Sequence, residues 1–231
     1  MAQMKPHKRV NDIFFGPLER PALAWLAAHM PAWMSPDLLT GIGVLGAVII
    51  LLSYALSNVA SGFLWLASLG FVINWFGDSL DGTLARYRHI ERPKYGYFVD
   101  HTVDSFNEFM IVIGLGLSPY VRFDIACLAL IGYLLMSVLV FIRTYVDGVF
   151  QLSYGRLGPT EVRVILISLN TVMFFARPGP ITLPLGTFTV YDLVVGTVAL
   201  LLIAIYLTSV YQQAKVLRRL ESGLAPQAVE A

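Results

Sequence analysis

The chain has 231 residues, of which 57% are hydrophobic and only 13% are charged, and its formal net charge at pH 7 is +1. Soluble domains carry about 25% charged residues, so this composition excludes an ordinary soluble enzyme and favours an integral membrane protein without a nucleic-acid partner. The single cysteine, Cys127, excludes an intrachain disulfide and a cysteine-based metal cluster.

The N-terminal segment divides into a polar start and an amphipathic stretch. Residues 1–12 are polar and precede no compact apolar region, so we expect no cleavable signal peptide. Residues 17–34 predict an amphipathic helix in the membrane interface, where Trp25 and Trp33 suit the headgroup level. An ordinary helix packed on the bundle is the alternative. The expected apolar face consists of Leu18, Ala22, Leu26 and Met30, with Leu23 and Ala27 beside it.

Six apolar stretches follow the N-terminal segment. Each is near the ~20 residues that a helix needs to cross ~30 Å of hydrocarbon, and the fifth is the shortest. We therefore predict an all-α integral membrane protein with six transmembrane helices plus the N-terminal amphipathic interfacial helix. The second stretch should continue as helix to about Tyr87. The stretches cover residues 38–57, 61–76, 96–117, 123–147, 160–176 and 191–211. The expected division is an N-terminal segment over residues 1–34, a membrane domain over 35–215 that contains a polar motif at 78–104, and a tail over 216–231.

The positive charges predict how the bundle is oriented. All of the 16 Lys and Arg residues except Arg122 and Arg177 fall on one side of the predicted spans. Lys and Arg are enriched in cytoplasmic loops. We therefore expect both termini and the polar motif to face the cytoplasm, in a protein of the cytoplasmic membrane.

Two pairs of aspartates mark the polar motif, Asp78 with Asp81 and Asp100 with Asp104. Their spacings of three and four residues place both members of a pair on one helix face. Both pairs lie at the ends of apolar runs, where membrane meets water. Four facing carboxylates repel one another, and oxygen ligands of this kind suit Mg²⁺, Mn²⁺ or Ca²⁺. The motif therefore predicts a divalent-metal site, although ion pairs with Arg86, Arg88 and Arg92 at a solvated helix end are the plainer interpretation.

The pattern D-x2-D-G-x2-A-R-x9-G-x3-D-x3-D resembles the signature of the CDP-alcohol phosphotransferase family, which comprises integral-membrane enzymes of phospholipid synthesis. The resemblance implies transfer of a phospho-alcohol or phosphatidyl group from a CDP-linked alcohol donor to the hydroxyl of a lipid or small-alcohol acceptor, with release of CMP. The signature positions are Asp78, Asp81, Gly82, Ala85, Arg86, Gly96, Asp100 and Asp104.

Roles for these residues follow partly from chemistry and partly from the resemblance. Gly82 and Ala85 leave the helix surface bare for a nucleotide, Gly96 allows close approach, and Arg86 offers a planar fork to phosphate oxygens. The resemblance implies two Mg²⁺ or Mn²⁺ ions. It assigns Asp78, Asp81 and Asp100 as metal ligands, and Asp104 as a ligand or as the base that deprotonates the acceptor hydroxyl.

A second match lies before the first span, where Pro36 and Thr40 agree with the family's pattern and Asp37 replaces its asparagine. Asp37 suits a helix N-cap. Thr40 is expected to reach the nucleotide.

The stretch F-V-D-H-T-V-D-S-F-N resembles the choline and ethanolamine phosphotransferases, but Thr102 departs from their usual glycine. Glu161 is expected either to start a helix or to meet a cationic head group. Arg143 and Arg163 instead suit a phosphorylated acceptor, as in the CDP-diacylglycerol-dependent inositol-phosphate branch. The candidates for the acceptor or head-group site are His101, Asn107, Glu108, Arg143, Glu161 and Arg163.

Two further expectations concern assembly and class. The resemblance implies a homodimer, for which Gly41, Gly43 and Gly46 allow close helix contact. Paired intramembrane acids also build ion sites in transporters, so an ion-coupled transporter is the alternative from another class. The chain lacks Gly/Pro-broken spans in two matching halves, which favours the enzyme.

Overall fold

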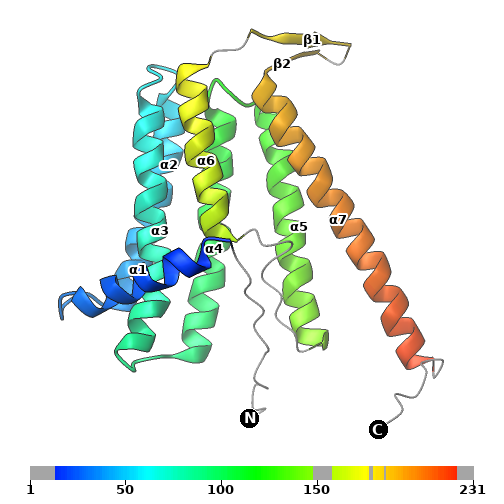
Figure 1. The fold of residues 1–231 in the computed structure, drawn as a ribbon. Helices are drawn as coiled ribbons and strands as arrows, with labels where there is room; N and C mark the ends of the chain where they lie inside the picture. Colours follow the sequence, from blue (N-terminus) through cyan, green and yellow to red (C-terminus); the bar gives the residue numbers. More distant parts are fainter. Residues whose placement is uncertain (1–13, 148–157, 177–178, 185, 223–231) are drawn as a thin grey trace.

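A computed structural model describes residues 14–147, 158–176, 179–184 and 186–222, and it is almost entirely helical (Figure 1). The predicted all-α class is therefore confirmed. Residues 1–13, Arg156, Arg177 and the tail after Ser222 lie outside the described residues, together with the expectations made for them. The elements are α1 (Gly16–His29), α2 (Pro36–Leu56), α3 (Phe63–Tyr87), α4 (Pro93–Leu117), α5 (Phe123–Asp147), α6 (Pro159–Phe175), β1 (Ile181–Leu183), β2 (Gly186–Phe188) and α7 (Val190–Glu221).

Four of these helices, α2, α3, α5 and α7, are long and apolar enough to cross a membrane. α4 and α6 coincide with the other two predicted spans. α6 has only 17 residues, and α4 carries Lys94, Asp100, Asp104 and Glu108, so neither meets the same criteria of length and composition. The segment between α6 and α7 contains an antiparallel hairpin of β1 and β2, which the sequence did not predict.

Helix starts follow local capping chemistry. Ser35 is the N-cap of α2, and its hydroxyl accepts a hydrogen bond from the Leu38 backbone at 3.2 Å. The expected capping role of Asp37 is therefore wrong: Asp37 lies in the first turn and pairs with Arg92 instead. At the other end of the chain, α7 runs ten residues beyond the predicted span, because residues 212–221 are mostly good helix formers.

α2 and α3 pack backbone against backbone. A Cβ atom added to Gly77 would lie 2.7 Å from Gly43 Cα, and one added to Gly46 would lie 2.5 Å from Asn74 N. Such contacts are possible only without side chains. We expected Gly43 and Gly46 at a contact between two copies of the chain, but both pack against α3 of the same chain. No atom of the described residues lies within 4 Å of a Cβ added to Gly41.

α1 crosses the other helices near the end of the bundle where α3 ends and α4 begins (Figure 1). Its buried side is formed by Leu23 and Ala27, which pack with Leu39, Leu80 and Leu84. Leu18 and Ala22, expected on the apolar face, are exposed. α7 packs on α5 and β2 and leans away from the remaining helices (Figure 1).

Candidate active site

The four aspartates of the motif come together between α3 and α4. Asp104 lies within hydrogen-bonding reach of Asp78 and interacts electrostatically with Asp100. Asp81, which is buried, lies near enough to Asp78 and Asp100 to be repelled by both. The spacing within each pair predicted a shared helix face, and the packing of α4 beside α3 brings the two pairs to one place.

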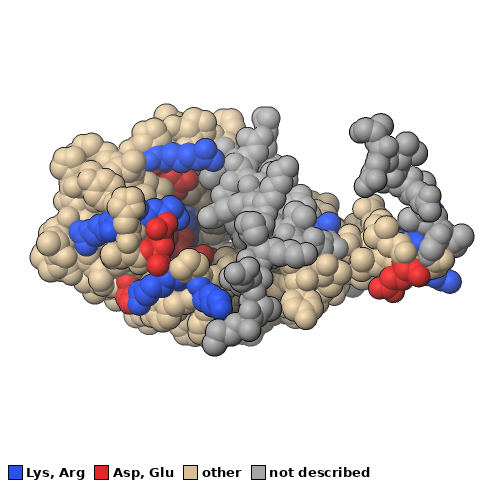
Figure 2. Space-filling view, turned by 90° about the horizontal axis from the view of Figure 1, so that it is seen from below, with Lys and Arg blue, Asp and Glu red and all other residues tan. Residues whose placement is uncertain are grey.

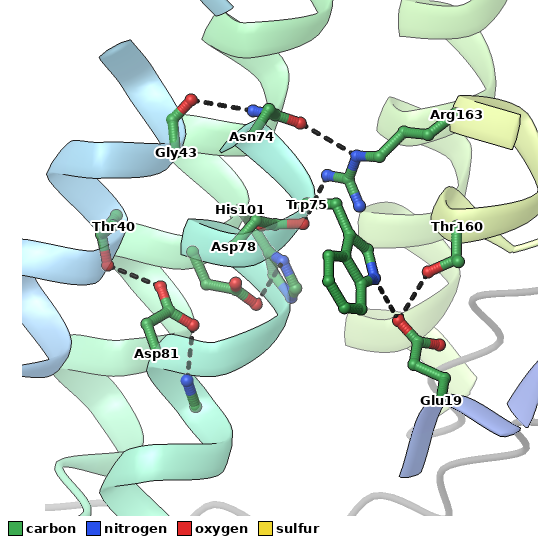
Figure 3. A network of polar contacts seen from close by, with 12 residues as sticks. Glu19, Thr40, Gly43, Asn74, Trp75, Asp78, Asp81, His101, Thr160 and Arg163 are labelled. Atoms are coloured by element: carbon green, nitrogen blue, oxygen red, sulfur yellow. Dashed lines mark hydrogen bonds and ion pairs between the residues drawn. The ribbon is translucent and has the colours of Figure 1, made fainter. Parts of the chain in front are cut away.

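Arg163 of α6 supplies the nearest positive charge to this cluster (Figure 3). Its Nη2 donates to Asp78 Oδ2 at 2.5 Å and its Nε donates to Asn74 Oδ1 at 2.9 Å. The side chains of Arg163 and Asp78 are only 12% and 17% exposed. A pair that is mostly removed from water is strongly coupled, because losing either partner leaves an uncompensated charge.

The arginines close to the motif in sequence have other partners. Arg88 donates to the backbone carbonyls of Met30, Pro31 and Met34. Arg92 pairs with Asp37. Arg86 donates to Thr83 Oγ1 at 3.1 Å. The alternative, in which the four aspartates of the motif form ion pairs with Arg86, Arg88 and Arg92, therefore receives no support from these contacts.

Thr40 of α2 contacts the cluster directly. Its hydroxyl donates to Asp81 Oδ2 at 2.5 Å, while the Gly82 backbone donates to Asp81 Oδ1 at 2.5 Å (Figure 3). Thr40 was expected near the nucleotide. The structure places its hydroxyl on a carboxylate, where it orients Asp81.

The donor set fits a hard divalent cation. Among the described residues, ligand atoms of Asp100, His101 and Asp104 all lie within 4.8 Å of one another, and Asp78 and Asp81 stand beside them. Carboxylate oxygens are the ligands that Mg²⁺ and Mn²⁺ prefer, and Arg163 places one positive charge beside the four carboxyl groups. His101 Nδ1 lies 3.5 Å from Asp100 Oδ2, and its ring packs against Tyr97 and Phe141.

The residues expected to bind the nucleotide lie toward the end of α3 and the start of α4. A Cβ on Gly82 would lie 3.2 Å from Arg86 Nη1, so the guanidinium covers this glycine. Gly96 faces open space. Ala85 is half-buried and Arg86 is exposed. A nucleotide lying on this surface would meet Arg86 first.

The candidates for the acceptor or head-group site are not equivalent. Asn107 is buried, and its Oδ1 has no hydrogen-bond partner among the described residues. Glu108 lies one turn beyond Asp104 and interacts with Arg163. Arg143 lies near the end of α5. Glu161 accepts from the backbone of Gly158 at 3.0 Å and of Phe15 at 2.7 Å, which gives it a structural role in starting α6 and holding α1.

The sequence did not single out two residues that hold the site together. Asn74 lies one turn before Asp78 on α3 and contacts α2 and α6. Glu19 Oε1 of α1 accepts from Trp75 Nε1 and from Thr160 Oγ1, both at 2.7 Å (Figure 3). The sequence did contain a signal for Asn74. It is a polar residue inside an apolar run, and because polar residues are costly within a membrane, such a residue is a candidate for a functional role.

The end of the bundle near α1 is rich in charge (Figure 2). Basic and acidic side chains gather there over the ends of α1, α3 and α4, and a second, smaller group marks the end of α7 (Figure 2). Along the chain, Arg86, Arg88, Arg92 and Lys94 lie around the end of α3 and the start of α4, and Lys215, Arg218 and Arg219 lie in the last turns of α7. Arg122 lies at the opposite end, where it pairs with Asp124 at the start of α5.

Comparison with known proteins adds an independent observation. The family model described as CDP-alcohol phosphatidyltransferase matches residues 33–211. Cholinephosphotransferase 1 of Danio rerio is 29% identical over 161 residues, which are 65% of this chain and 41% of that protein. Archaetidylinositol phosphate synthase of Pyrococcus horikoshii is 34% identical over 104 residues, 45% of this chain and 52% of that protein.

A phosphatidylinositol phosphate synthase of Cutibacterium acnes is 37% identical over 92 residues, 39% of this chain and 41% of that protein. The matched region of the chain thus spans between two fifths and about half of the length of these relatives.

Proposed function

Because the chain belongs to the CDP-alcohol phosphatidyltransferase family, we propose that it transfers a phospho-alcohol or phosphatidyl group from a CDP-linked alcohol to an acceptor hydroxyl and releases CMP. The observation that carries this proposal is the meeting of Asp78, Asp81, Asp100 and Asp104 beside Arg163. Such a cluster suits a charged pyrophosphate only if divalent cations accompany it.

Two Mg²⁺ or Mn²⁺ ions, when bound, neutralise the pyrophosphate and stabilise the attacking and leaving oxygens. Asp78, Asp81 and Asp100 would hold these ions. Thr40 keeps Asp81 oriented through its 2.5 Å hydrogen bond, so that its carboxylate need not reorganise during the reaction. Arg86 binds phosphate oxygens of the nucleotide from the exposed side.

Asp104 accepts the proton of the acceptor hydroxyl as that hydroxyl attacks phosphorus, and CMP departs. The position of Asp104 supports this role: it is one turn further along α4 than Asp100 and lies within reach of Asp78. The attack needs the hydroxyl within roughly 3–3.5 Å of the phosphorus.

We favour a choline- or ethanolamine-type donor with a diacylglycerol-like acceptor. The longest of the three matches is to a cholinephosphotransferase, and the engagement of Arg163 by Asn74 and Asp78 leaves it less available to a phosphorylated acceptor. The second candidate is a CDP-diacylglycerol-dependent transfer to an inositol-phosphate-like or glycerol-phosphate-like acceptor. It is supported by the higher identity to two inositol-phosphate lipid synthases.

A panel assay tests both candidates. The purified chain is mixed with CDP-choline, CDP-ethanolamine or CDP-diacylglycerol, each with its acceptor and Mg²⁺ or Mn²⁺, and CMP is measured. We expect CMP with one donor class and none after EDTA. Failure of every donor to give CMP, or full activity in EDTA, would contradict the proposed reaction, and an ion-coupled transporter would release none.

The proposed topology has six spans, α2 to α7, with α1 in the cytoplasmic interface and both termini and the site at the cytoplasmic side. The charges of Arg86, Arg88, Arg92 and Lys94 at the site end support it, as does the crossed position of α1 (Figure 1). A site there opens to the cytoplasm for the nucleotide and laterally to the inner leaflet for a lipid. Cysteine labelling of either terminus from the outer side would contradict this arrangement.

We propose a homodimer as the assembled form. The large exposed apolar faces of α5 and α7 leave room for a second copy. Native mass measurement in detergent should give twice the protomer mass, and a single-protomer mass would count against a dimer.

A further inference from the structure

Asn74 links three helices through one side-chain amide. Its Nδ2 donates to Gly43 O of α2 at 2.9 Å, and its Oδ1 accepts from Arg163 Nε of α6 at 2.9 Å (Figure 3). Only one orientation of the amide satisfies both partners, because the carbonyl needs a donor and the guanidinium needs an acceptor. The residue is 1% exposed.

The backbone around Asn74 leaves this amide little freedom. A Cβ on Gly46 would lie 2.5 Å from Asn74 N and 2.9 Å from Asn74 Cβ, so α2 lies directly against the residue. Asn74 and Asp78 are four residues apart on α3 and thus share a face. The Nε and Nη2 atoms on one edge of the Arg163 guanidinium therefore reach two α3 side chains, one turn apart.

This arrangement restricts how Arg163 meets Asp78. Arginine commonly binds a carboxylate through two parallel hydrogen bonds, which would use both carboxylate oxygens. Here Arg163 Nε donates to Asn74 Oδ1 instead. Among the contacts of the described residues, Arg163 Nη2 donates to Asp78 Oδ2 alone. Asp78 Oδ1 stays outside the hydrogen bonds of the guanidinium.

We infer that Asn74 is a positioning residue that holds Arg163 on one oxygen of Asp78 and keeps the other oxygen available to a divalent cation. The inference rests on the proposed metal-dependent function. Without Asn74, Nε would turn to Asp78, and Arg163 would compete with the cation for both oxygens. Arg163 would still offset the negative charge of Asp78, but its guanidinium would also occupy the Asp78 oxygen that the cation needs.

Titration of Mn²⁺ into the purified chain, without any CDP-linked substrate, tests this inference. Outer-sphere partners of metal ligands typically contribute about 10–100-fold in affinity, so Asn74→Ala should raise the Mn²⁺ dissociation constant about tenfold. In an Arg163→Gln background, where no guanidinium competes, adding Asn74→Ala should leave the dissociation constant unchanged.

Ser68→Ala is the matched control on the same helix. Ser68 also links α3 to α6, by accepting a 3.2 Å hydrogen bond from Asn170 Nδ2, but it lies away from the aspartates. Its loss should lower the thermal unfolding temperature without changing Mn²⁺ affinity. Equal Mn²⁺ affinities for Asn74→Ala and Ser68→Ala, or an undiminished effect of Asn74→Ala in the Arg163→Gln background, would overturn the inference. Failure of CMP release alongside normal Mn²⁺ binding would instead count against the proposed reaction only.

Discussion

Two regions of this bundle are built in opposite ways. α2 and α3 touch through glycine backbones, and hydrogen bonds of Asn74, Asn170 and Arg163 link these two helices to α6. α5 and α7 are strongly apolar, approach each other closely where Gly132 faces Ala199 O, and leave much of their surface exposed. The residues that carry chemistry lie in the first region, together with α4. We call α2, α3 and α6 the α2–α3–α6 corner. Its packing depends on close backbone contacts and on polar side chains with defined partners, whereas the α5–α7 pair depends more on helix length and hydropathy.

The largest expected effect is on the proposed base, at the edge of the α2–α3–α6 corner. Asp104→Asn keeps the size of the side chain but cannot take a proton, so turnover should fall about 10²–10⁴-fold. Nucleotide affinity, measured by calorimetry with a CDP-alcohol, should change much less.

Arg86→Ala is the control for that measurement, because it should weaken nucleotide binding strongly. If both variants lost the same affinity, Asp104 would be another ligand and the division of roles would be wrong.

Gly77→Ala tests the backbone contact within the corner. The new methyl group would lie 2.7 Å from Gly43 Cα, so α2 and α3 must separate, and overpacking of this kind costs about 1–3 kcal/mol. Thermal unfolding in detergent should show the loss.

Gly196→Ala on α7 is the matched variant in the other region, since its methyl group would meet Ile125 at an ordinary 3.7 Å. Equal destabilisation by both glycine variants would remove the contrast between the two regions.

Thr40→Val removes the hydroxyl that donates to Asp81 while keeping the shape of the side chain. A hydrogen bond to a charged group contributes about 1.5 kcal/mol at the lower end, so CMP release should fall roughly tenfold. Thr197→Val on α7 removes a hydroxyl that, among the described residues, donates to Leu193 O of its own helix, and activity should be unchanged. A Thr40→Val variant as active as the parent would exclude an orienting role.

The smallest effect is expected on the outer surface of α7. Leu200 is 64% exposed, so Leu200→Ala should change the free energy of unfolding by less than about 0.5 kcal/mol. Thermal unfolding in detergent should show no clear shift. A large loss would mean that this face is covered, and repeating the measurement on the monomer and dimer fractions would identify a second copy as the cover.

The sequence by itself determined the helices and the faces of the aspartate pairs. Apolar runs near twenty residues predicted where α2 to α7 lie, because helix formation and hydropathy depend on neighbours along the chain. The spacing of Asp78 with Asp81, and of Asp100 with Asp104, placed each pair on one face for the same local reason. The signature positions and the family followed from that spacing.

Only the tertiary structure decided the partners of the site. Arg163 lies 85 residues from Asp78 and 89 from Asn74 along the chain, and no local pattern says which charge will meet which. The same holds for Gly43 and Gly46, which we expected at a dimer contact and which pack against α3 in the structure. These choices depend on how closely two backbones approach, and that distance is set by side chains from several helices at once.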